Sequence, residues 1–310
     1  MVAMPVDTGD LPARPCLVRI AHGGNQQVAL WSGGRLTSVD AGLDELLRLT
    51  AGQMRAALAT SAVGLDPGAC ELLAPAESQE VWACGVTYWR SRDARMEESS
   101  SQDVYAKVYE ADRPELFFKS AGWRVVGHGG GAGVRADSTW SVPEPELAVL
   151  SNSHGEVVGY ACGNDMSSRS IEGENPLYLP QAKVYDRSCS IGPAAVLAWE
   201  VDPSESAITM RISRGGTTVF DGATSLSDMV RDPAELTAVL HASYPLPAGA
   251  WLLTGTSLVP PPPYTAEPGD SVTIEIEGVG RLVNHIVSVP HSGARAQPRL
   301  RRDSHVMRGG

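Results

Sequence analysis

The stretch WSVPEPELAVL (residues 140–150), followed by SNSHG (151–155) and EVVGYACGND (156–165), decides the fold of this chain. The first and third segments have the mixture of β-branched, aromatic and small apolar residues that is typical of strands, and the segment between them is rich in turn-forming residues. The three segments together predict a β-hairpin. Because successive side chains of a strand point to opposite faces, Glu144 and Glu146 lie on the same face, where their negative charges repel.

The register of the hairpin brings further residues to this face. With the turn centred in the middle of SNSHG, the numbers of opposite residues add up to about 307, so Glu144 faces Gly163 and Glu146 faces Ala161. Asp165 falls just past this pair on the same face. Three carboxylates beside two small residues leave a hollow for a hard divalent cation, Mg²⁺, Mn²⁺ or Ca²⁺ rather than Zn²⁺. A plain solvated strand face is the alternative interpretation of the two glutamates.

The segments on either side of the hairpin predict the domain organisation. Residues 16–39 alternate apolar and polar positions with Gly pairs at the breaks, which indicates short antiparallel strands, and residues 41–60 have helical spacing. We therefore expect a small N-terminal α+β domain over residues 1–78. A catalytic β domain is expected over residues 79–290, and a basic tail with five arginines over residues 291–310.

The catalytic part is a run of short strand-like segments with few helices. The clearest helix is predicted for residues 232–242, where Asp232 can cap the first turn and Pro233 fits it. Many short strands with so few helices predict a mainly β or α+β fold class.

Composition and charge exclude several classes of protein. The net charge of -11 speaks against nucleic acid and anionic membranes as partners, since both are bound through basic surface. The sequence has no apolar run long enough to span a bilayer and no signal peptide at its start, so we expect a cytoplasmic protein. The five cysteines are scattered and never within CxxC spacing, which predicts buried reduced thiols.

Lysine is rare in this chain. Only Lys107, Lys119 and Lys183 occur among the 25 basic residues, so the surface positive charge is supplied by arginine. A lysine at a given position is therefore more often required there as lysine than it is in an average protein.

The segment GNDMSSRSIEGENPLYLPQAKVYDRSCSIGP (163–193) resembles the fumarylacetoacetate hydrolase family. The pattern is E-x-E, then an Asp that opens a D-x-S-x-R run, then a Lys that leads to Gly-Pro. The later segment LLTGTSLVPPPPYTAEPGDSVTIEIEGVGRLVN (252–284) resembles the closing part of that family. The matching residues of the pattern are Glu144, Glu146, Asp165, Arg169, Lys183, Gly192 and Pro193.

The resemblance implies a mixed, rolled β-sheet domain and a homodimer or higher homo-oligomer. It implies Mg²⁺ held by Glu144, Glu146 and Asp165, a catalytic role for Lys183 beside the metal, and a small 2-oxo acid as substrate. It also marks Glu115 as a catalytic acid or base. It further implies that Thr256 contacts substrate. The Gly/Asn/Pro-rich segment IEGENPLYLP (171–180) predicts a loop near the site, so Glu172 and the preceding Arg169 are candidates for substrate binding, and Ser91 is another.

One departure from the hydrolytic members of the family favours a different reaction. Those members have a Tyr followed at the third position by His and at the sixth by Glu, a pair that activates water. After Tyr88 this chain has Ser91 and Ala94 at these positions. The sequence around these positions resembles the branch of the family that dehydrates 2-keto-3-deoxy sugar acids, for example 2-dehydro-3-deoxy-D-arabinonate to 2,5-dioxopentanoate. The alternatives are a C–C hydrolase or decarboxylase of acylpyruvates, and a non-catalytic binding protein on the same fold.

Overall fold

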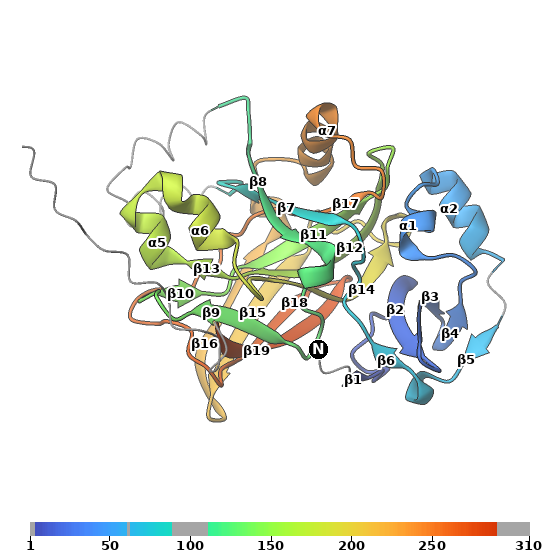
Figure 1. Ribbon diagram of the computed structural model, residues 1–310, viewed down its shortest axis with the longest axis horizontal. Coiled ribbons are helices and arrows are strands. Elements are labelled where there is room, and N and C mark those ends of the chain that lie inside the picture. The colour runs from blue at the N-terminus through green and yellow to red at the C-terminus, as the bar shows by residue number, and fades with distance from the viewer. Residues whose placement is uncertain (1–3, 61–62, 89–110, 290–310) are drawn as a thin grey trace, which may run out of the picture.

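The computed structural model describes residues 4–60, 63–88 and 111–289. Ser91, Ala94 and the tail predicted at residues 291–310 lie outside the described residues. Within them the chain is mostly sheet with a few short helices, as the sequence predicts, and Figure 1 shows the sheets stacked at the centre of the molecule.

The largest sheet has twelve strands. Its main path follows the order β5, β4, β3, β2, β14, β12, β11, β17, β7 and β8, while β6 pairs with both β1 and β2. Neighbours are antiparallel except for β17 and β7, which are parallel. The strands are β1 (Met4–Pro5), β2 (Cys16–His22), β3 (Asn25–Ser32), β4 (Arg35–Ser38), β5 (Gly64–Leu65), β6 (Glu71–Leu72), β7 (Glu80–Gly85), β8 (Glu115–Ala121), β11 (Pro145–Ser151), β12 (Val157–Asp165), β14 (Cys189–Leu197) and β17 (Ala250–Leu253).

A five-stranded sheet packs against this one, with the order β16, β15, β18, β19 and β9. A short ladder of two strands, β10 and β13, lies beside it. These strands are β9 (Gly131–Arg135), β10 (Ser141–Val142), β13 (Ser167–Ser168), β15 (Ala207–Arg214), β16 (Thr217–Ser225), β18 (Ser271–Ile276) and β19 (Gly280–Val289).

Strand β11 shows how one strand serves two cores. Leu147 and Val149 pack into a cluster that includes residues of the five-stranded sheet, and Ala148 and Leu150 pack into another cluster on the opposite face. The strand is buried along its whole length. Alternation of side chains therefore assigns the even-numbered residues of β11, Glu146 among them, to the second face.

The helices lie at the edges of the sheets, and none within the described residues is long and apolar enough to cross a bilayer. The helix predicted for residues 232–242 is confirmed as α7 (Pro233–Ser243): Asp232 Oδ1 accepts a hydrogen bond of 2.6 Å from the Ala234 amide at its start. The α-helices are α1 (Leu43–Leu46), α2 (Ala51–Leu58), α5 (Arg169–Glu174), α6 (Leu179–Lys183) and α7 (Pro233–Ser243). The 3₁₀ helices are η1 (Pro67–Ala69), η2 (Gly122–Arg124), η3 (Pro176–Tyr178), η4 (Ala198–Glu200) and η5 (Leu226–Asp228).

The N-terminal strands continue the large sheet. Cys16 and Leu17 of β2 pair with Val196 and Ala195 of β14, so hydrogen bonds cross the boundary that the sequence predicts near residue 78. A separate N-terminal domain over residues 1–78 stays a prediction. All five cysteines are buried and unpaired, as expected.

The hairpin of β11 and β12 forms, but its predicted register is wrong by two residues. Glu146 pairs with Gly163, so the numbers of paired residues add up to 309. The turn is closed by Asn152, whose Oδ1 accepts the amides of His154 and Glu156, and a bulge next to Leu150 adds one more residue to β12. A shift of two keeps every side chain on its predicted face.

Candidate active site

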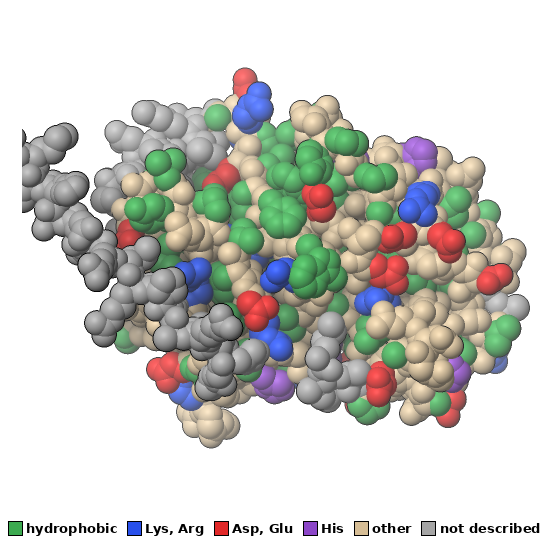
Figure 2. Space-filling view, viewed as in Figure 1, with side chains coloured by type: hydrophobic (Ala, Val, Ile, Leu, Met, Phe, Trp, Pro, Cys, Tyr) green, Lys and Arg blue, Asp and Glu red, His purple; other side chains and the backbone are tan. Residues whose placement is uncertain are grey.

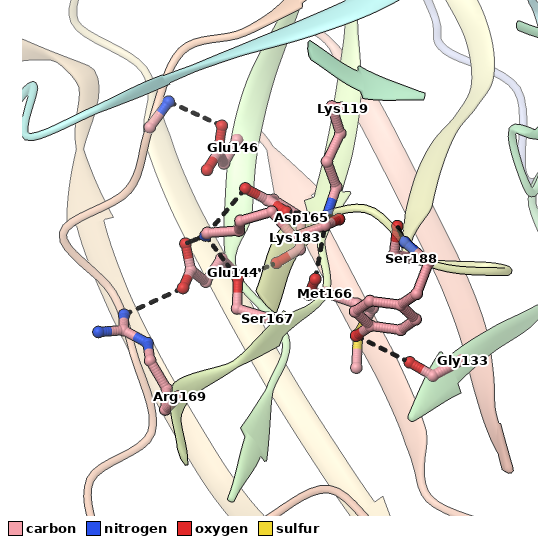
Figure 3. Close-up of polar contacts among 12 residues, drawn as sticks. Lys119, Gly133, Glu144, Glu146, Asp165, Met166, Ser167, Arg169, Lys183 and Ser188 are labelled. Carbon is pink, nitrogen blue, oxygen red and sulfur yellow. Dashed lines mark hydrogen bonds and ion pairs between the residues drawn. The ribbon is translucent and has the colours of Figure 1, made fainter. Parts of the chain in front are cut away.

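The candidate site lies at one end of the large sheet. Strands β7 and β17 are parallel and end there, and so does β12. Their antiparallel neighbours β8 and β11 begin at the same end. Residues that are distant in the sequence therefore meet at this edge, and the side chains on one face of it form the site (Figure 3).

Three buried carboxylates form the centre of the site. Glu144 directly precedes β11, Glu146 is the second residue of that strand, and Asp165 is the last residue of β12. The Asp165 amide donates a hydrogen bond of 2.9 Å to the Glu144 carbonyl, which places these two residues opposite each other. Each of the three carboxylates offers an oxygen, and these oxygens lie within 4.8 Å of one another. The three residues are at most 2% exposed, so a solvated strand face is ruled out.

The predicted hollow opposite the glutamates has a different position. Ala161 pairs with Ala148 rather than with Glu146, because the register is shifted. Gly163 does stand opposite Glu146, but a Cβ at Gly163 would lie 2.5 Å from Leu253 Cδ2. The Leu253 side chain therefore fills the space next to Gly163, and the predicted hollow is absent there. The three carboxylates instead face one another directly, with oxygens within 4.8 Å.

Lys183 is the last residue of α6 and its ammonium reaches into this cluster. Its Nζ donates to Glu144 Oε2 at 2.9 Å and to Asp165 Oδ2 at 3.0 Å (Figure 3). The third bond, of 2.5 Å, goes to Ser167 Oγ. An ammonium has three N–H donors, so all of them are used in this arrangement. Lys183 fixes the orientation of two of the three carboxylates.

A second buried lysine, Lys119 of β8, was not predicted as a site residue. Its Nζ forms an ion pair with Asp165 Oδ1 and donates to the carbonyls of Met166 at 3.0 Å and Lys183 at 2.5 Å. The residue is fully buried. The two oxygens of Asp165 are thus each held by a different lysine. The scarcity of lysine in the chain is the signal that could have found Lys119.

Helix α5 brings a guanidinium to the cluster and carries a further buried carboxylate. The helix is capped by Ser168, whose Oγ accepts the Ile171 amide at 3.4 Å. Arg169 Nη2 lies 3.0 Å from Glu144 Oε1, and Arg169 is 6% exposed. Glu172 follows three residues later on the same side of the helix and is 3% exposed. Arg169 is therefore buried beside the carboxylate cluster, and Glu172 is buried about one turn further along the same helix.

The loop after β17 supplies a backbone donor. The Gly255 amide donates to Glu146 Oε2 at 2.7 Å, and Gly255 has a φ of +87°, which favours glycine. A Cβ there would also lie 3.1 Å from the carbonyl of Cys84 at the end of β7. The next residue, Thr256, is 7% exposed and its Oγ1 accepts the Leu258 amide at 3.1 Å.

The charge of the cluster favours a cation. Burial raises the pKa of Glu146 well above its usual range, and the negative charges of Asp165 and Glu144 raise it further, against the opposing effects of Lys183 and the Gly255 amide. Carboxylate oxygens are the ligands that Mg²⁺ and Ca²⁺ prefer. Glu144, Glu146 and Asp165 therefore fit a hard divalent cation both in donor type and in charge.

Glu115, the predicted acid or base, is the half-buried first residue of β8. It stands opposite Gly85, the last residue of β7. Burial raises the pKa of the adjacent Cys84 thiol, and the negative charges of Glu146 and Glu115 raise it further. Glu115 and Glu146 thus flank the same end of β7.

The chain matches the family described as fumarylacetoacetate (FAA) hydrolase, C-terminal, over residues 86–287. It is 54% identical to the probable 2-keto-3-deoxyxylonate dehydratase of Haloferax volcanii over 216 residues, which are 69% of this chain and 74% of that protein. It is 40% identical to the 2-dehydro-3-deoxy-D-arabinonate dehydratase of Saccharolobus solfataricus over 217 residues, 68% of this chain and 73% of that protein.

Solved structures with the same fold include a 2-keto-3-deoxy-D-arabinonate dehydratase complexed with magnesium and 2,5-dioxopentanoate. That structure has a TM-score of 0.77 and 32% sequence identity, and the match covers 88% of this chain and 98% of the other. The apo form of a 2-keto-3-deoxy-D-arabinonate dehydratase gives a TM-score of 0.78 at 32% identity, over 91% and 99% of the two chains. The predicted fold is confirmed. The chain belongs to the fumarylacetoacetate (FAA) hydrolase family.

Proposed function

We propose that this protein is a Mg²⁺-dependent hydro-lyase that dehydrates a 2-keto-3-deoxy sugar acid, for example 2-dehydro-3-deoxy-D-arabinonate to 2,5-dioxopentanoate. The observation that carries the proposal is the buried cluster of Glu144, Glu146 and Asp165. This cluster lies within the family match, and the two curated relatives described above are named as dehydratases of such acids.

Glu144, Glu146 and Asp165 would hold the cation. When bound, Mg²⁺ supplies Lewis acidity that polarises the 2-keto group of the substrate and makes the C3 protons more acidic. The protein contributes the orientation of its ligands. Lys183 and Lys119 hold the two oxygens of Asp165, and Arg169 holds Glu144.

Glu115 moves the proton in this proposal. Its carboxylate takes a proton from C3, and the resulting carboxylic acid returns that proton to the C4 hydroxyl as the C4–O bond breaks. The C3–H and C4–O bonds are lost, a C3–C4 double bond forms, and one water molecule leaves. Transfer of one proton from C5 to C3 then moves the double bond to C4–C5, and the resulting enol gains a proton at C4 as its C5 hydroxyl loses one, which gives the aldehyde of 2,5-dioxopentanoate. Glu115 ends as a carboxylate, ready for another turnover. No water nucleophile is needed, which agrees with Ser91 and Ala94 in place of a His and Glu pair.

The remaining predicted residues have roles in binding. Arg169 and Glu172 enter from α5, so they reach the substrate carboxylate or its hydroxyls from one side, while Thr256 lies next to the Gly255 amide on the other. Ser91 is proposed to contact substrate as well. Lys183 is proposed as a proton donor to the substrate, which requires it to exchange one of its three present partners.

A coupled assay tests the proposal. The Mg²⁺-loaded protein is given 2-keto-3-deoxypentonate, as each C4 epimer, and acetylpyruvate in parallel, each with and without EDTA. We expect EDTA-sensitive formation of an aldehyde product that a semialdehyde dehydrogenase oxidises, and little turnover of acetylpyruvate. Turnover of acetylpyruvate alone would favour a hydrolase or decarboxylase. Silence on every acid, from a protein that binds Mg²⁺, would favour a binding protein.

We also propose a cytoplasmic homodimer or higher homo-oligomer. Buried, unpaired cysteines fit a reducing compartment. Exposed aromatic side chains fit an assembly surface. Phe118 is 38%, Tyr244 43% and Trp123 67% exposed, and Figure 2 shows hydrophobic side chains gathered around β7, β8 and α7.

A further inference from the structure

Gly85 and Glu115 are directly opposite each other where β7 ends and β8 begins. Opposite residues of an antiparallel pair point to the same side of the sheet, at a separation of about 4.5–5.5 Å between Cβ atoms. Phe117 follows Glu115 two positions later, within the regular part of the β7–β8 pairing, and so lies on this side too. Lys183 Nζ lies 5.9 Å from the centroid of the Phe117 ring, so this is the face of β8 that carries the active site.

The space beside Gly85 is occupied by the carboxylate of Glu115. A Cβ at Gly85 would lie 2.7 Å from Glu115 Cδ and closer still to Oε2. The φ of Gly85 does not lie in the positive range that favours glycine, so other residues can also adopt its backbone conformation. Glycine is required at this position because the Glu115 side chain leaves no room for a Cβ, and not because of the backbone conformation.

We propose that Gly85 is a positioning residue, the seat on which the Glu115 carboxylate rests. The inference deepens the proposed function and rests on it, because it assigns to Gly85 the placement of the group that moves the proton. A misplacement of a reacting group by about 1 Å can cost about 100-fold in rate. Even one methyl group at position 85 would therefore be felt in turnover.

The chain on both sides of the seat is tied to one short segment. The Val230 amide donates to the Thr87 carbonyl at 2.9 Å, two residues after Gly85. The next residue, Arg231, donates to the Ala111 carbonyl at 2.5 Å and to the Asp112 carbonyl at 3.3 Å. Asp112 is only three residues before Glu115, so the ends of β7 and β8 are held in place relative to each other. With the backbone fixed in this way, the Glu115 side chain is the part that gives way to a new Cβ.

A double-mutant cycle tests the seat. Gly85→Ala is expected to lower kcat by about 100-fold, with KM changed by less than about 3-fold, because substrate binding does not depend on the carboxylate position. In the Glu115→Ala background the same substitution meets no carboxylate, so it should change the residual kcat by less than about 2-fold. The pH profile of kcat should lose the same limb in Gly85→Ala and in Glu115→Gln. The melting temperature of Gly85→Ala should equal that of the wild type within about 2 °C.

A control and a structure complete the test. Gly64→Ala adds a methyl group to another strand, where nothing lies within 4 Å of the new Cβ, and should leave kcat unchanged. A crystal structure of Gly85→Ala should show the Glu115 carboxylate rotated away while β7 and β8 remain paired. An unchanged carboxylate position, a wild-type kcat in Gly85→Ala, or an equal loss in the Glu115→Ala background would each overturn the seat. Wild-type turnover in Glu115→Ala would instead overturn the role of Glu115 itself, and the crystal structure would still decide whether the carboxylate is seated on Gly85.

Discussion

Lys183 holds two of the three carboxylates of the site in place. Its ammonium bridges Glu144 and Asp165, so its removal leaves two buried carboxylates facing each other without the charge between them. We expect Lys183→Met to lower kcat by about 10²–10⁴-fold, the range that a positioned proton-transfer group contributes. Steady-state kinetics at saturating Mg²⁺ measure the effect. A kcat above a tenth of the wild-type value would contradict the assignment.

A matched control separates this loss from a general effect of removing a positive charge. Arg211 pairs with Asp221 on the surface, with 65% and 52% of the two side chains exposed. Exposed pairs contribute about 0–1 kcal/mol, so Arg211→Met should keep both kcat and the melting temperature near the wild-type values.

At the scale of residues, the sequence predicts part of the site and misses part. Glu144, Glu146 and Asp165 could be placed together because strand alternation fixes their face even when the register is wrong by two residues. Lys119 could not be placed, because the sequence pattern of β8 does not show that its side chain contacts Asp165 at the end of β12. The contact of Gly85 with Glu115 depends on the pairing of β7 with β8, which are separated by a segment too long to fix a register.

Among the elements, the turn between β11 and β12 sets the position of every ligand on the hairpin. Asn152 is fully buried; its Oδ1 accepts two amides of the turn, and its Nδ2 donates to the Leu49 carbonyl at 2.9 Å. Asn152→Ala leaves these groups without partners, at a cost of about 1–3 kcal/mol for each group that stays buried. We expect the free energy of unfolding to fall by about 3 kcal/mol, measured by urea denaturation.

The same turn supplies the control for this prediction. Ser153 uses its backbone amide to donate to the Leu47 carbonyl at 2.8 Å, a bond that alanine keeps. Ser153→Ala should therefore change stability by less than about 0.5 kcal/mol. Equal losses in Ser153→Ala and Asn152→Ala would show that the turn tolerates no substitution, and the assignment to the Asn152 side chain would then be wrong.

In the five-stranded sheet, Asp270 ties β15 to the start of β18. Burial raises the pKa of Asp270, but hydrogen bonds and charge from Arg214, with the Glu267 amide and Tyr264, bring it below its usual value. A carboxylate with a lowered folded pKa adds stability above its unfolded pKa of about 4, and this is lost as the pH falls toward the folded pKa. Asp270→Asn should therefore cost about 2 kcal/mol at pH 7, and the gap to the wild type should close below about pH 4.

Urea denaturation at several pH values between 7 and 3.5 measures this gap. Asp221→Asn is the comparison, because Asp221 is half exposed and its pair with Arg211 should contribute less than about 1 kcal/mol at any pH. A gap for Asp270→Asn that stays constant down to pH 3.5 would show that the ionised carboxylate is not what stabilises the native state.

For the molecule as a whole, the carboxylate cluster links folding to cation binding. Glu144, Glu146 and Asp165 come from two strands that meet only in the native sheet, so the unfolded chain has no such site. A ligand that binds only the native state stabilises it by about 2.7 kcal/mol at a concentration of 100 times its Kd. For a chain of this size we expect a rise in melting temperature of about 5–10 °C with Mg²⁺, reversed by EDTA.

Two variants decide whether that rise comes from the cluster. Glu146→Gln removes one ligand charge that burial makes costly, so it should be at least as stable as the wild type without metal and should show little response to Mg²⁺. Glu205→Gln removes a charge from an exposed position and should respond to Mg²⁺ as the wild type does. A full response in Glu146→Gln would place the stabilising cation elsewhere on the molecule, because a cation held by three buried carboxylates loses most of its affinity when one of them becomes neutral.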